Sequence, residues 1–449
     1  MQYSIINFSE AKKEKRFDAE FYKNDYVKIL NNILKHNYKF LYEIASNKYK
    51  KLPNNKKDVE WKYIEIDKII CFQNDYNYTI FLKGDTLPSR ASKIPKLHDI
   101  IISTVRPTRG AISIFNDIEK NIIVSSGFSI VHTDKINNNY LYTVLSSSFY
   151  LKLYERLTKA SMYPAMSEED LFNLPIPIFS DEFQKSIEKL VLEAHNQRQI
   201  SNSLMKEANE ILEKEIGFDK LEIKKKKVNY STVNYSETLL SKRIDAEYYQ
   251  EKYKIIMDKI QSYKNGCIKI TDLNSINNKL VSIDKNKKYE YIELSNIDSM
   301  GFIDNLELYY GYELPSRARR LLNNNDVIIS SVEGSLDKSS LIYNNKNNLL
   351  CSTGFLVFNE NEFINPETLF CFFRLTLIKE LLKKISKGTI LTAFDSNAIC
   401  DMDIPNLDKN VQNVIANKVQ ESYKARDRAK ALLEEAKKKV EDAIENGEN

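Results

Sequence analysis

The feature that most constrains the fold of this chain is an internal repeat. Several segments of the first half return in the second half in the same order, each 227 or 228 residues later. Collinear matches at one offset do not arise by chance, so the chain contains two homologous halves. The repeated pairs are "RFDAEFY" (16–22) and "RIDAEYY" (243–249), "YIEI" (63–66) and "YIEL" (291–294), "LPSRASK" (87–93) and "LPSRARR" (314–320), "HDIIISTV" (98–105) and "NDVIISSV" (325–332), "SSGFSIV" (125–131) and "STGFLVF" (352–358), and "PIPI" (175–178) and "DIPN" (403–406).

Length and composition agree with two globular domains. The chain has 449 residues, 42% of them hydrophobic and 29% charged. No apolar run is long enough to span a membrane, and the polar start predicts no signal peptide. Five scattered cysteines without a Cys-x-x-Cys pair predict buried thiols in a reducing cytoplasm, and a net charge of +4 permits nucleic-acid binding without requiring it.

Each half is expected to be a mixed α/β domain of the α+β type. Short strand-like runs come first, among them "DIIISTV", "IIVSSGFSIV" and their second-half counterparts. A helix follows in each half. In the second half Asn365 can cap it and Pro366 suits its first position, and in the first half a helix is expected from Asn139.

A long heptad segment follows each domain. Its apolar and small residues step by four and three, which is the seam of a coiled coil. Ser180 or Asp181 can cap the first helix, and Gly217 suits its end. Such a helix is on the order of 50 Å long. The seam residues are Phe183, Ile187, Leu190, Ala194, Gln197, Ser201, Leu204, Ala208 and Ile211, and Val411, Ile415, Ser422, Ala425, Ala429, Leu432 and Ala436.

These patterns predict four segments. They are a first domain (1–179), a first long helix (180–217), a linker with the second domain (218–406) and a second long helix (407–445). The simplest assembly packs the two helices against each other, with a globular domain at each end. The alternative is that each helix packs only on its own domain.

No catalytic constellation is present in the sequence. The histidines (His36, His98, His132 and His195) stand alone, and there is no metal-binding spacing, no phosphate-binding glycine loop and no Asn-Pro-Pro or Asp-Pro-Pro sequence. Asp219, Glu222 and Lys224 resemble a nuclease pattern but belong to a charged linker. The run Lys224–Lys227 could contact phosphates, although runs of this kind are more often charged linkers. We therefore predict no catalytic site, metal or cofactor in this chain.

The repeated Pro-Ser-Arg loops and the loops after the next strand carry the candidate DNA contacts. A hydroxyl beside guanidinium groups on a proline-stiffened backbone suits phosphates or base edges. Between the halves "VRPTRG" becomes "VEGSLD" on an otherwise similar scaffold, and base readout needs this kind of change because arginine reads guanine and glutamate accepts from cytosine. The candidates are Ser89, Arg90, Lys93, Arg106, Thr108 and Arg109, and Ser316, Arg317, Arg319, Arg320, Glu333, Ser335 and Lys338.

Two alternative roles of these loops stay open. Loops drift freely where strands cannot, so divergence alone does not establish readout. The repeated arginines could also be structural and pair with Asp99 and Asp326 or with other carboxylates to hold the loop. Two domains that read different sequences would not keep their base-reading residues constant. The constant motif therefore suits phosphate positioning or loop shape, and we expect the discriminating contacts in "VRPTRG" and "VEGSLD".

The order of these motifs, their duplication and the paired helices resemble the specificity subunit of type I restriction-modification enzymes. The resemblance covers nearly the whole chain. It implies two target-recognition domains, each reading one half of an interrupted double-stranded DNA target. It also implies an antiparallel coiled coil that spaces the half-sites and docks two modification subunits. Those partners would carry S-adenosylmethionine, and restriction subunits would add ATP and magnesium chemistry.

Alternative functions remain from other classes. The chain could be the specificity component of another methyltransferase or phage-defence system, a nuclease or methyltransferase acting alone, or a coiled-coil scaffold without DNA readout.

Overall fold

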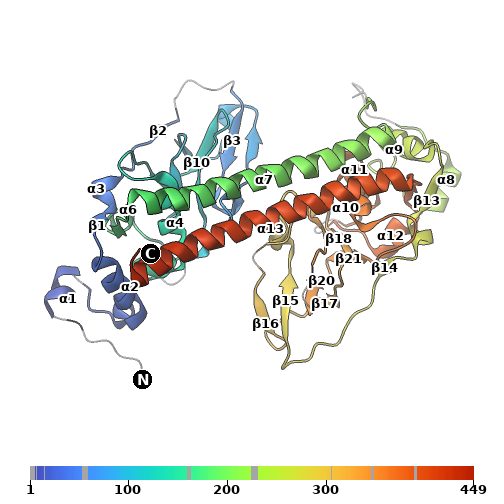
Figure 1. Ribbon diagram of the computed structural model, residues 1–449. Coiled ribbons are helices and arrows are strands. Elements are labelled where there is room, and N and C mark those ends of the chain that lie inside the picture. Colours follow the sequence, from blue (N-terminus) through green and yellow to red (C-terminus); the bar gives the residue numbers. More distant parts are fainter. Residues whose placement is uncertain are drawn as a thin grey trace. The chain divides into compact units, whose positions relative to one another are not determined.

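The computed structural model divides the chain into two compact units (Figure 1). The first unit contains residues 1–199 and 426–449, and the second contains residues 200–425. The residues described are 6, 8–14, 16–52, 59–158, 163–223, 231–304, 306–344, 348–388 and 392–448. Each unit therefore combines one globular domain with part of both long helices, which differs from the expected division into domains and separate helices.

The first unit contains a five-stranded and a three-stranded sheet. Their orders are β2-β7-β10-β3-β6 and β11-β8-β9, and the pairs β1-β12 and β4-β5 lie beside them. The strands are β1 (Tyr38–Phe40), β2 (Lys50–Lys51), β3 (Trp61–Ile64), β4 (Ile69–Ile70), β5 (Asp75–Tyr76), β6 (Thr79–Phe81), β7 (Ala91–Ile94), β8 (Ile100–Ser103), β9 (Ile112–Ile114), β10 (Ile122–Ser125), β11 (Phe128–Val131) and β12 (Pro175–Pro177).

The second unit repeats the core of this topology in two four-stranded sheets. Its sheets are β16-β15-β20-β17 and β14-β21-β18-β19, with the pair β13-β22. The strands are β13 (Cys267–Lys269), β14 (Ile276–Asn277), β15 (Lys288–Ile292), β16 (Leu308–Tyr310), β17 (Ala318–Leu321), β18 (Val327–Ser330), β19 (Ser339–Leu341), β20 (Leu349–Ser352), β21 (Phe355–Phe358) and β22 (Asp403–Pro405).

The two halves match in register as well as in strand order. The parallel pair β3–β10 aligns Lys62 with Ile122, and the parallel pair β15–β20 aligns Glu290 with Leu349. The antiparallel neighbours β7 and β17 occupy the same place beside β10 and β20. Homology that was inferred from short motifs therefore extends to the hydrogen-bond ladders.

The sequence run "IIVSSGFSIV" forms two strands instead of one. β10 ends at Ser125 and β11 begins at Phe128, and the two strands belong to different sheets. Gly127 lies at the corner between them, where an added Cβ would approach Ile66 Cδ1 to 2.8 Å. Ser125, Ser126 and Gly127 at the centre of the run mark this corner between two fully buried strands.

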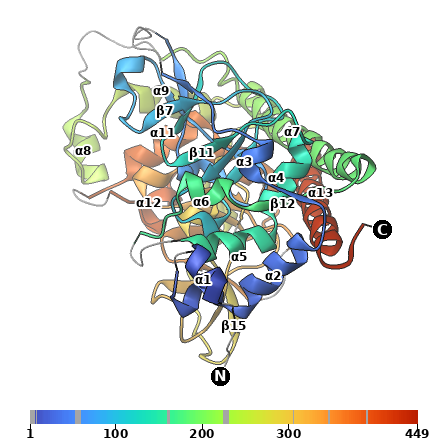
Figure 2. The same cartoon turned by 90° about the vertical axis from the view of Figure 1, so that its left-hand side faces the viewer.

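The shorter helices follow the repeat too. They are α1 (Phe8–Glu14), α2 (Asn24–Leu34), α3 (Leu41–Ile44), α4 (Asn138–Ser146), α5 (Ser148–Leu157) and α6 (Glu168–Phe172), then α8 (Tyr235–Ser241), α9 (Glu251–Gln261), α10 (Pro366–Arg374), α11 (Thr376–Ile385) and α12 (Ser396–Cys400). In the first unit α1, α2 and α5 lie together (Figure 2).

Local capping explains where α4 and α10 begin. The Asn365 side chain accepts from the Thr368 N–H with proline at the first position, as predicted. In the first unit the cap is Asn137, which accepts from the Tyr140 N–H, and the helix begins at Asn138, so the expected start at Asn139 was one residue late. The first half lacks the proline that marks the position in the second.

The two long helices are α7 (Asp181–Ile216) and α13 (Lys409–Asn446). The Ser180 hydroxyl accepts from the Phe183 N–H and caps α7. Gly217 ends it with φ of +79°, where its N–H and that of Phe218 donate back to the last turn.

The buried stripe of α7 differs from the predicted seam at alternate positions, whereas in α13 every predicted seam residue is buried except Val411, which is half-buried. Ile187, Ala194, Ser201 and Ala208 are buried as expected. The positions between them are filled by neighbours of the predicted residues, because a second set of residues one position further along satisfies the same period. The buried residues between them are Val191, Arg198, Met205 and Leu212, whereas Leu190, Gln197, Leu204 and Ile211 are only partly buried.

In both units a stretch of α7 packs antiparallel to a stretch of α13. In the second unit Ser201 faces Ser422 with their hydroxyls 3.0 Å apart, and Lys418 pairs with Glu207 at 2.7 Å. In the first unit the Ser180 N–H donates to Glu448 at 2.8 Å. The helices contact each other, as the simplest assembly predicts, and both also join the core of each unit. The predicted fold class, two homologous α+β domains with antiparallel long helices, is confirmed.

Two remaining expectations concern single features. Cys351 and Cys371 are buried, but Cys267 is exposed, so the prediction that all thiols are buried was wrong. No helix in the described part of the chain is long and apolar enough to cross a membrane.

Shortening a residue of the observed seam should cost more than shortening its neighbour. Met205→Ala removes a fully buried side chain and should lower the free energy of unfolding by about 2–5 kcal/mol. Leu204→Ala is the matched control and should cost at most about 1.5 kcal/mol. Urea denaturation followed by circular dichroism measures both, and a larger loss from Leu204→Ala would support the seam predicted from sequence.

Candidate DNA-recognition surface

The repeated Pro-Ser-Arg segments form turns that begin β7 and β17. The Pro88 carbonyl accepts from the Ala91 N–H and the Pro315 carbonyl from the Ala318 N–H, both at 2.9 Å. The arginine carbonyls then accept from the corner that follows β10 or β20. Arg90 bonds to the Ser126 N–H at 2.7 Å and Arg317 to the Thr353 N–H at 2.9 Å. The motif thus joins two other repeated segments, which gives its retention a structural reason.

The side chains of this turn still face solvent. Ser89, Arg90, Ser316 and Arg317 are exposed. Arg317 pairs with Glu293 at 3.1 Å, where a surface ion pair contributes little stability. Both guanidinium groups can therefore exchange their present contacts for a phosphate.

The same cluster of side chains surrounds each of these arginines. Burial raises the pKa of Tyr63, and the charge of Arg90 opposes part of that rise. Burial likewise raises the pKa of Tyr291, which Ser352 and Arg317 oppose. A tyrosine thus lies close to the guanidinium group in each unit.

Lys93 was predicted to contact DNA, but it is buried. Its Nζ donates to the Phe128 carbonyl at 2.6 Å and to Glu168 at 2.8 Å, and it lies 4.8 Å from the centre of the Tyr49 ring. With 6% of its surface exposed, this ammonium group holds β7 in place and is not available to phosphate.

The last two arginines of "LPSRARR" are half-buried and hydrogen-bonded to backbone carbonyls. Arg319 Nε donates to the Val281 carbonyl at 3.0 Å, and Arg320 donates to the Asn277 carbonyl at 3.5 Å. Burial lowers the pKa of Arg320. Both side chains connect β17 to the segment before β15.

The repeated arginines do not pair with Asp99 and Asp326. Asp99 accepts from the Lys96 N–H and bonds to His132 Nδ1 at 2.7 Å. Asp326 accepts from the Asn323 N–H and from Asn359. Each carboxylate instead bonds to the turn before its strand. The two named partners were therefore wrong, whereas pairing with another carboxylate holds for Arg317, which contacts Glu293.

The diverged loop of the first unit presents cations. It forms the short 3-10 helix η4 (Pro107–Arg109) directly after β8. Thr108 and Arg109 are exposed, and Arg106 is half-buried with φ of +48° and lies 5.8 Å from the Tyr163 ring centre. This loop offers two guanidinium groups within four residues.

The equivalent loop of the second unit presents an acid. It forms η7 (Glu333–Ser335) after β18. Glu333 and Ser335 are half-buried, and Lys338 Nζ donates to the Ile297 carbonyl at 2.6 Å. The ammonium of Lys338 is engaged, which leaves Glu333 and Ser335 as the groups that can reach a base edge.

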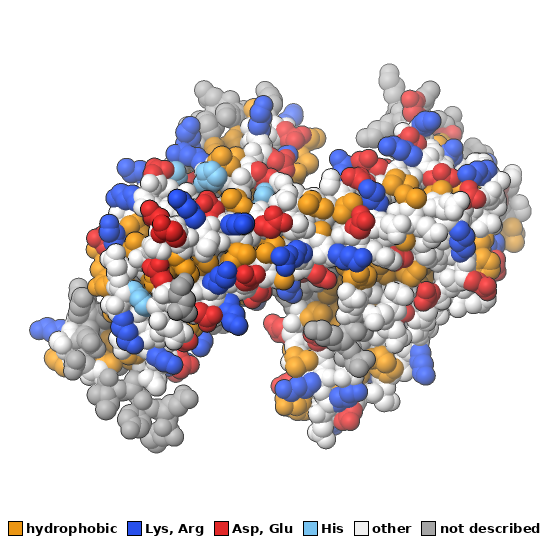
Figure 3. Space-filling model, in the orientation of Figure 1, with side chains coloured by type: hydrophobic (Ala, Val, Ile, Leu, Met, Phe, Trp, Pro, Cys, Tyr) orange, Lys and Arg blue, Asp and Glu red, His pale blue; other side chains and the backbone are white. Residues whose placement is uncertain are grey.

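Sequence reasoning missed a further basic and aromatic surface around the β15–β16 hairpin. Tyr310 and Tyr312 stack with ring centres 5.4 Å apart, and Lys288 lies 4.7 Å from the Tyr310 ring centre. Lys285 and Lys287 are exposed beside them, and Figure 3 shows basic and hydrophobic side chains together over this hairpin. Exposed rings next to lysines suit nucleic acid. The signal was the run "DKNKKYEY" followed by "LYYGYE".

The predicted partner-docking residues of the long helices are mainly internal. Leu190 and Leu204 are half-buried and the others are buried. The fully or almost fully buried ones are Ile187, Ala194, Ser201, Ala208, Ile415, Ser422, Ala429, Leu432 and Ala436. They build the helix pair, so a partner would meet the outer faces of α7 and α13, where acidic and basic side chains are interspersed (Figure 3).

Two remaining site expectations concern charge and metal. Among the described residues there is no group of three or more His, Cys, Asp or Glu side chains that could hold a metal ion. The run Lys224–Lys227 lies outside the described residues.

Solved structures similar to this chain are type I restriction-modification S subunits. The HsdS subunit from Thermoanaerobacter tengcongensis is 14% identical over 92% of this chain and 97% of its own, with a TM-score of 0.34. The type I S subunit from M. genitalium is 13% identical over 92% and 96%, with a TM-score of 0.40. A chain from work on the complex assembly and conformational transition of the type I R-M system is 15% identical over 92% and 98%, with a TM-score of 0.35.

Comparisons of sequence add nothing to this likeness. No protein-family model matches the chain, and no curated protein matches it either.

Substitution of Lys93 and of Arg90, two cations of the first Pro-Ser-Arg segment, should distinguish a residue that stabilises the fold from one that is free to bind. Lys93→Ala leaves the Phe128 carbonyl and the Glu168 carboxylate without this donor and should cost about 1–3 kcal/mol of stability. Arg90→Ala should change stability by less than about 0.5 kcal/mol. Thermal unfolding followed by circular dichroism tests both, and a larger loss from Arg90→Ala would reverse the two assignments.

Proposed function

We propose that this chain is the non-catalytic DNA-recognition subunit of a type I restriction-modification assembly. One observation carries the proposal. The same strand scaffold is built twice with matching register, and the loops at one equivalent position differ in charge, with Arg106 and Arg109 in one unit and Glu333 in the other. A duplicated scaffold with different base-edge partners suits a target with two different halves.

The other features support the same role. The exposed Arg90 and Arg317 turns suit phosphate contacts that position each domain without reading sequence. The diverged loops η4 and η7 then supply the discriminating contacts. The paired helices would set the gap between half-sites and dock two modification subunits.

The chemistry would belong to the partners. Modification subunits would bind S-adenosylmethionine and methylate adenine, and restriction subunits would use ATP and magnesium. The double-stranded DNA and these subunits would be the partners of a chain that acts in the cytoplasm without a membrane. A specificity component of another methyltransferase or phage-defence system would share this arrangement, whereas a scaffold without DNA readout would not need the two diverged loops.

Binding to DNA should depend on salt and on sequence. The full chain with its modification subunits should bind its target with a logarithmic affinity that falls by about 0.9 per phosphate contact for each logarithmic unit of salt. Gel mobility shifts at two salt concentrations, with target and scrambled duplexes, measure both effects. Equal binding to both duplexes, unaffected by salt, would contradict the proposal.

Exchanging one domain should change only half of the target. Replacing residues 60–175 with the corresponding segment of another such subunit should alter the recognised bases on one side of the gap. Selection of bound sequences from a random duplex pool reads out both sides at once. A change on both sides, or none, would show that the domains do not read separate half-sites.

A further inference from the structure

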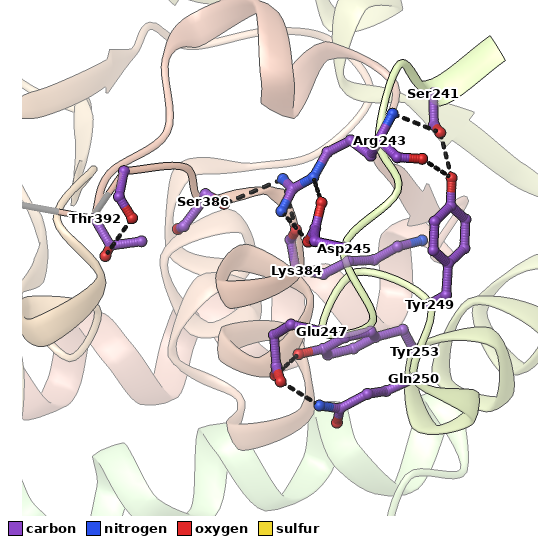
Figure 4. A network of polar contacts seen from close by, with 11 residues as sticks. Ser241, Arg243, Asp245, Glu247, Tyr249, Gln250, Tyr253, Lys384, Ser386 and Thr392 are labelled. Carbon is purple, nitrogen blue, oxygen red and sulfur yellow. Dashed lines mark hydrogen bonds and ion pairs between the residues drawn. The ribbon is translucent and has the colours of Figure 1, made fainter. Parts of the chain in front are cut away.

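The repeated segment "RFDAEFY"/"RIDAEYY" has no role in the proposed function so far, yet it is among the best-preserved parts of the repeat. In the second unit its arginine and aspartate form a two-pronged ion pair (Figure 4). Arg243 Nε and Nη2 each donate to one oxygen of Asp245 at 2.6 Å. The Tyr249 hydroxyl donates to the Arg243 carbonyl at 2.7 Å and closes the segment on itself.

The guanidinium group of Arg243 reaches beyond this pair to the end of α11. Its Nη1 donates to the Ser386 carbonyl at 3.2 Å and lies 3.5 Å from the Lys384 carbonyl. Only 14% of its side chain is exposed. The last carbonyls of a helix lack partners within the helix and carry partial negative charge, so a cation here stabilises the way the chain leaves α11.

The chain that leaves α11 then holds the diverged loop of the same unit. Lys387 and Ala393 exchange backbone hydrogen bonds, and Ala393 forms a bridge with Val332. The Glu333 N–H donates to the Thr392 carbonyl at 2.9 Å. Glu333 is the first residue of η7. The backbone of the candidate recognition loop is therefore hydrogen-bonded to the segment whose start Arg243 contacts.

A second connection runs through the glutamate of the repeated segment. The Tyr253 hydroxyl donates to Glu247 at 3.1 Å. Burial raises the pKa of Tyr253, and the carboxylates of Glu247, Glu380 and Glu333 raise it further. Glu333 thus lies within electrostatic reach of the side chains that the repeated segment positions.

The first unit repeats the ion pair and the tyrosine contact, and places them beside η4. Arg16 and Asp18 form the two-pronged pair with both distances 2.6 Å, and the Tyr22 hydroxyl donates to the Arg16 carbonyl at 3.0 Å. Arg16, Asp18 and Thr108 line one cavity of about 550 Å³, together with Thr158 and Pro164.

The backbone contacts to η4 also match those to η7. The Arg106 N–H donates to the Pro164 carbonyl at 2.7 Å, and Val105 forms a bridge with Ala165. Pro164 and Ala165 lie 228 residues before Thr392 and Ala393. The charge of the loop differs between the units, but the backbone hydrogen bonds that hold the loop are the same.

We propose that the Arg-x-Asp pair of each repeated segment is a positioning device for the recognition loop of its own unit, Arg16 and Asp18 for η4 and Arg243 and Asp245 for η7. The proposal rests on the proposed function, because it assigns these residues an effect on one half-site each. The pair touches no DNA itself. It fixes the backbone from which the loop side chains reach the bases.

Substitution of Arg243 should impair recognition of one half-site only. In the full chain with its modification subunits, Arg243→Ala should lower affinity for the target about 5- to 30-fold, the effect of one or two kcal/mol. Discrimination against base changes should fall in the half-site read by the second unit and stay unchanged in the other. Arg16→Ala should give the mirror result, and Lys254→Ala, at an exposed cation of α9, should change neither.

Arg243→Lys is the control for the case in which Arg243→Ala fails to fold. It keeps the charge beside Asp245 but loses the planar fork, so it should fold like the unmodified chain and show the same one-sided loss, at smaller size. Equal losses of discrimination at both half-sites, or no loss from either arginine, would overturn the proposal.

Hydrogen exchange separates this inference from the proposed function. Arg243→Ala should speed amide exchange at least fivefold in residues 331–338 and leave residues 104–112 unchanged, with or without DNA, and Arg16→Ala should do the reverse. If the chain read no DNA sequence but exchange shifted in this way, the proposed function would fail and the positioning role would stand. Unchanged exchange in both loops would overturn the positioning role.

Discussion

The structure depends on the close packing of α7 against α13 in each unit. Small side chains occupy the buried stripe, with Ala194 and Ala436 in the first unit and Ser201 and Ser422 in the second. The seam residues belong to the same clusters as the domain cores, including the aromatic residues of α10 in the second unit. Each domain therefore completes its core with segments from two distant parts of the chain. Neither domain can be cut out as a continuous piece without exposing that core.

The repeat extends to buried polar contacts. Gln184 donates to the Phe179 carbonyl and accepts from the Asn137 N–H, so the first turn of α7 is tied to the cap of α4. Gln412 does the same for α13, through the Leu407 carbonyl and the Asn365 N–H. Buried polar groups are costly unless each finds its partner, so such pairs must be kept or lost together. Both halves retain these contacts, so the scaffold is constrained by its buried polar pairs. The change of "VRPTRG" to "VEGSLD" lies on this otherwise retained scaffold.

Much of this could be predicted from the sequence because it rests on period and repetition. The duplication, the α+β class, the long helices and the Gly217 terminus all follow from patterns within a few residues. The rest depended on partners distant in the chain. Nothing near Lys93 shows that it meets Glu168, 75 residues away, and nothing near Arg243 points to the end of α11. The choice between Leu204 and Met205 in the seam could not be made from the sequence either, because both residues are apolar and helix rotation depends on the neighbouring helix.

The central claim is that one chain carries two separate readers of one interrupted DNA target. Its most direct test is the map of methylated adenines in DNA from cells that express this chain with its modification subunits. The account predicts methylation within a single motif made of two specific halves and a gap of fixed length, which disappears when the chain is deleted. Methylation at an uninterrupted motif, or a pattern that survives the deletion, would contradict it.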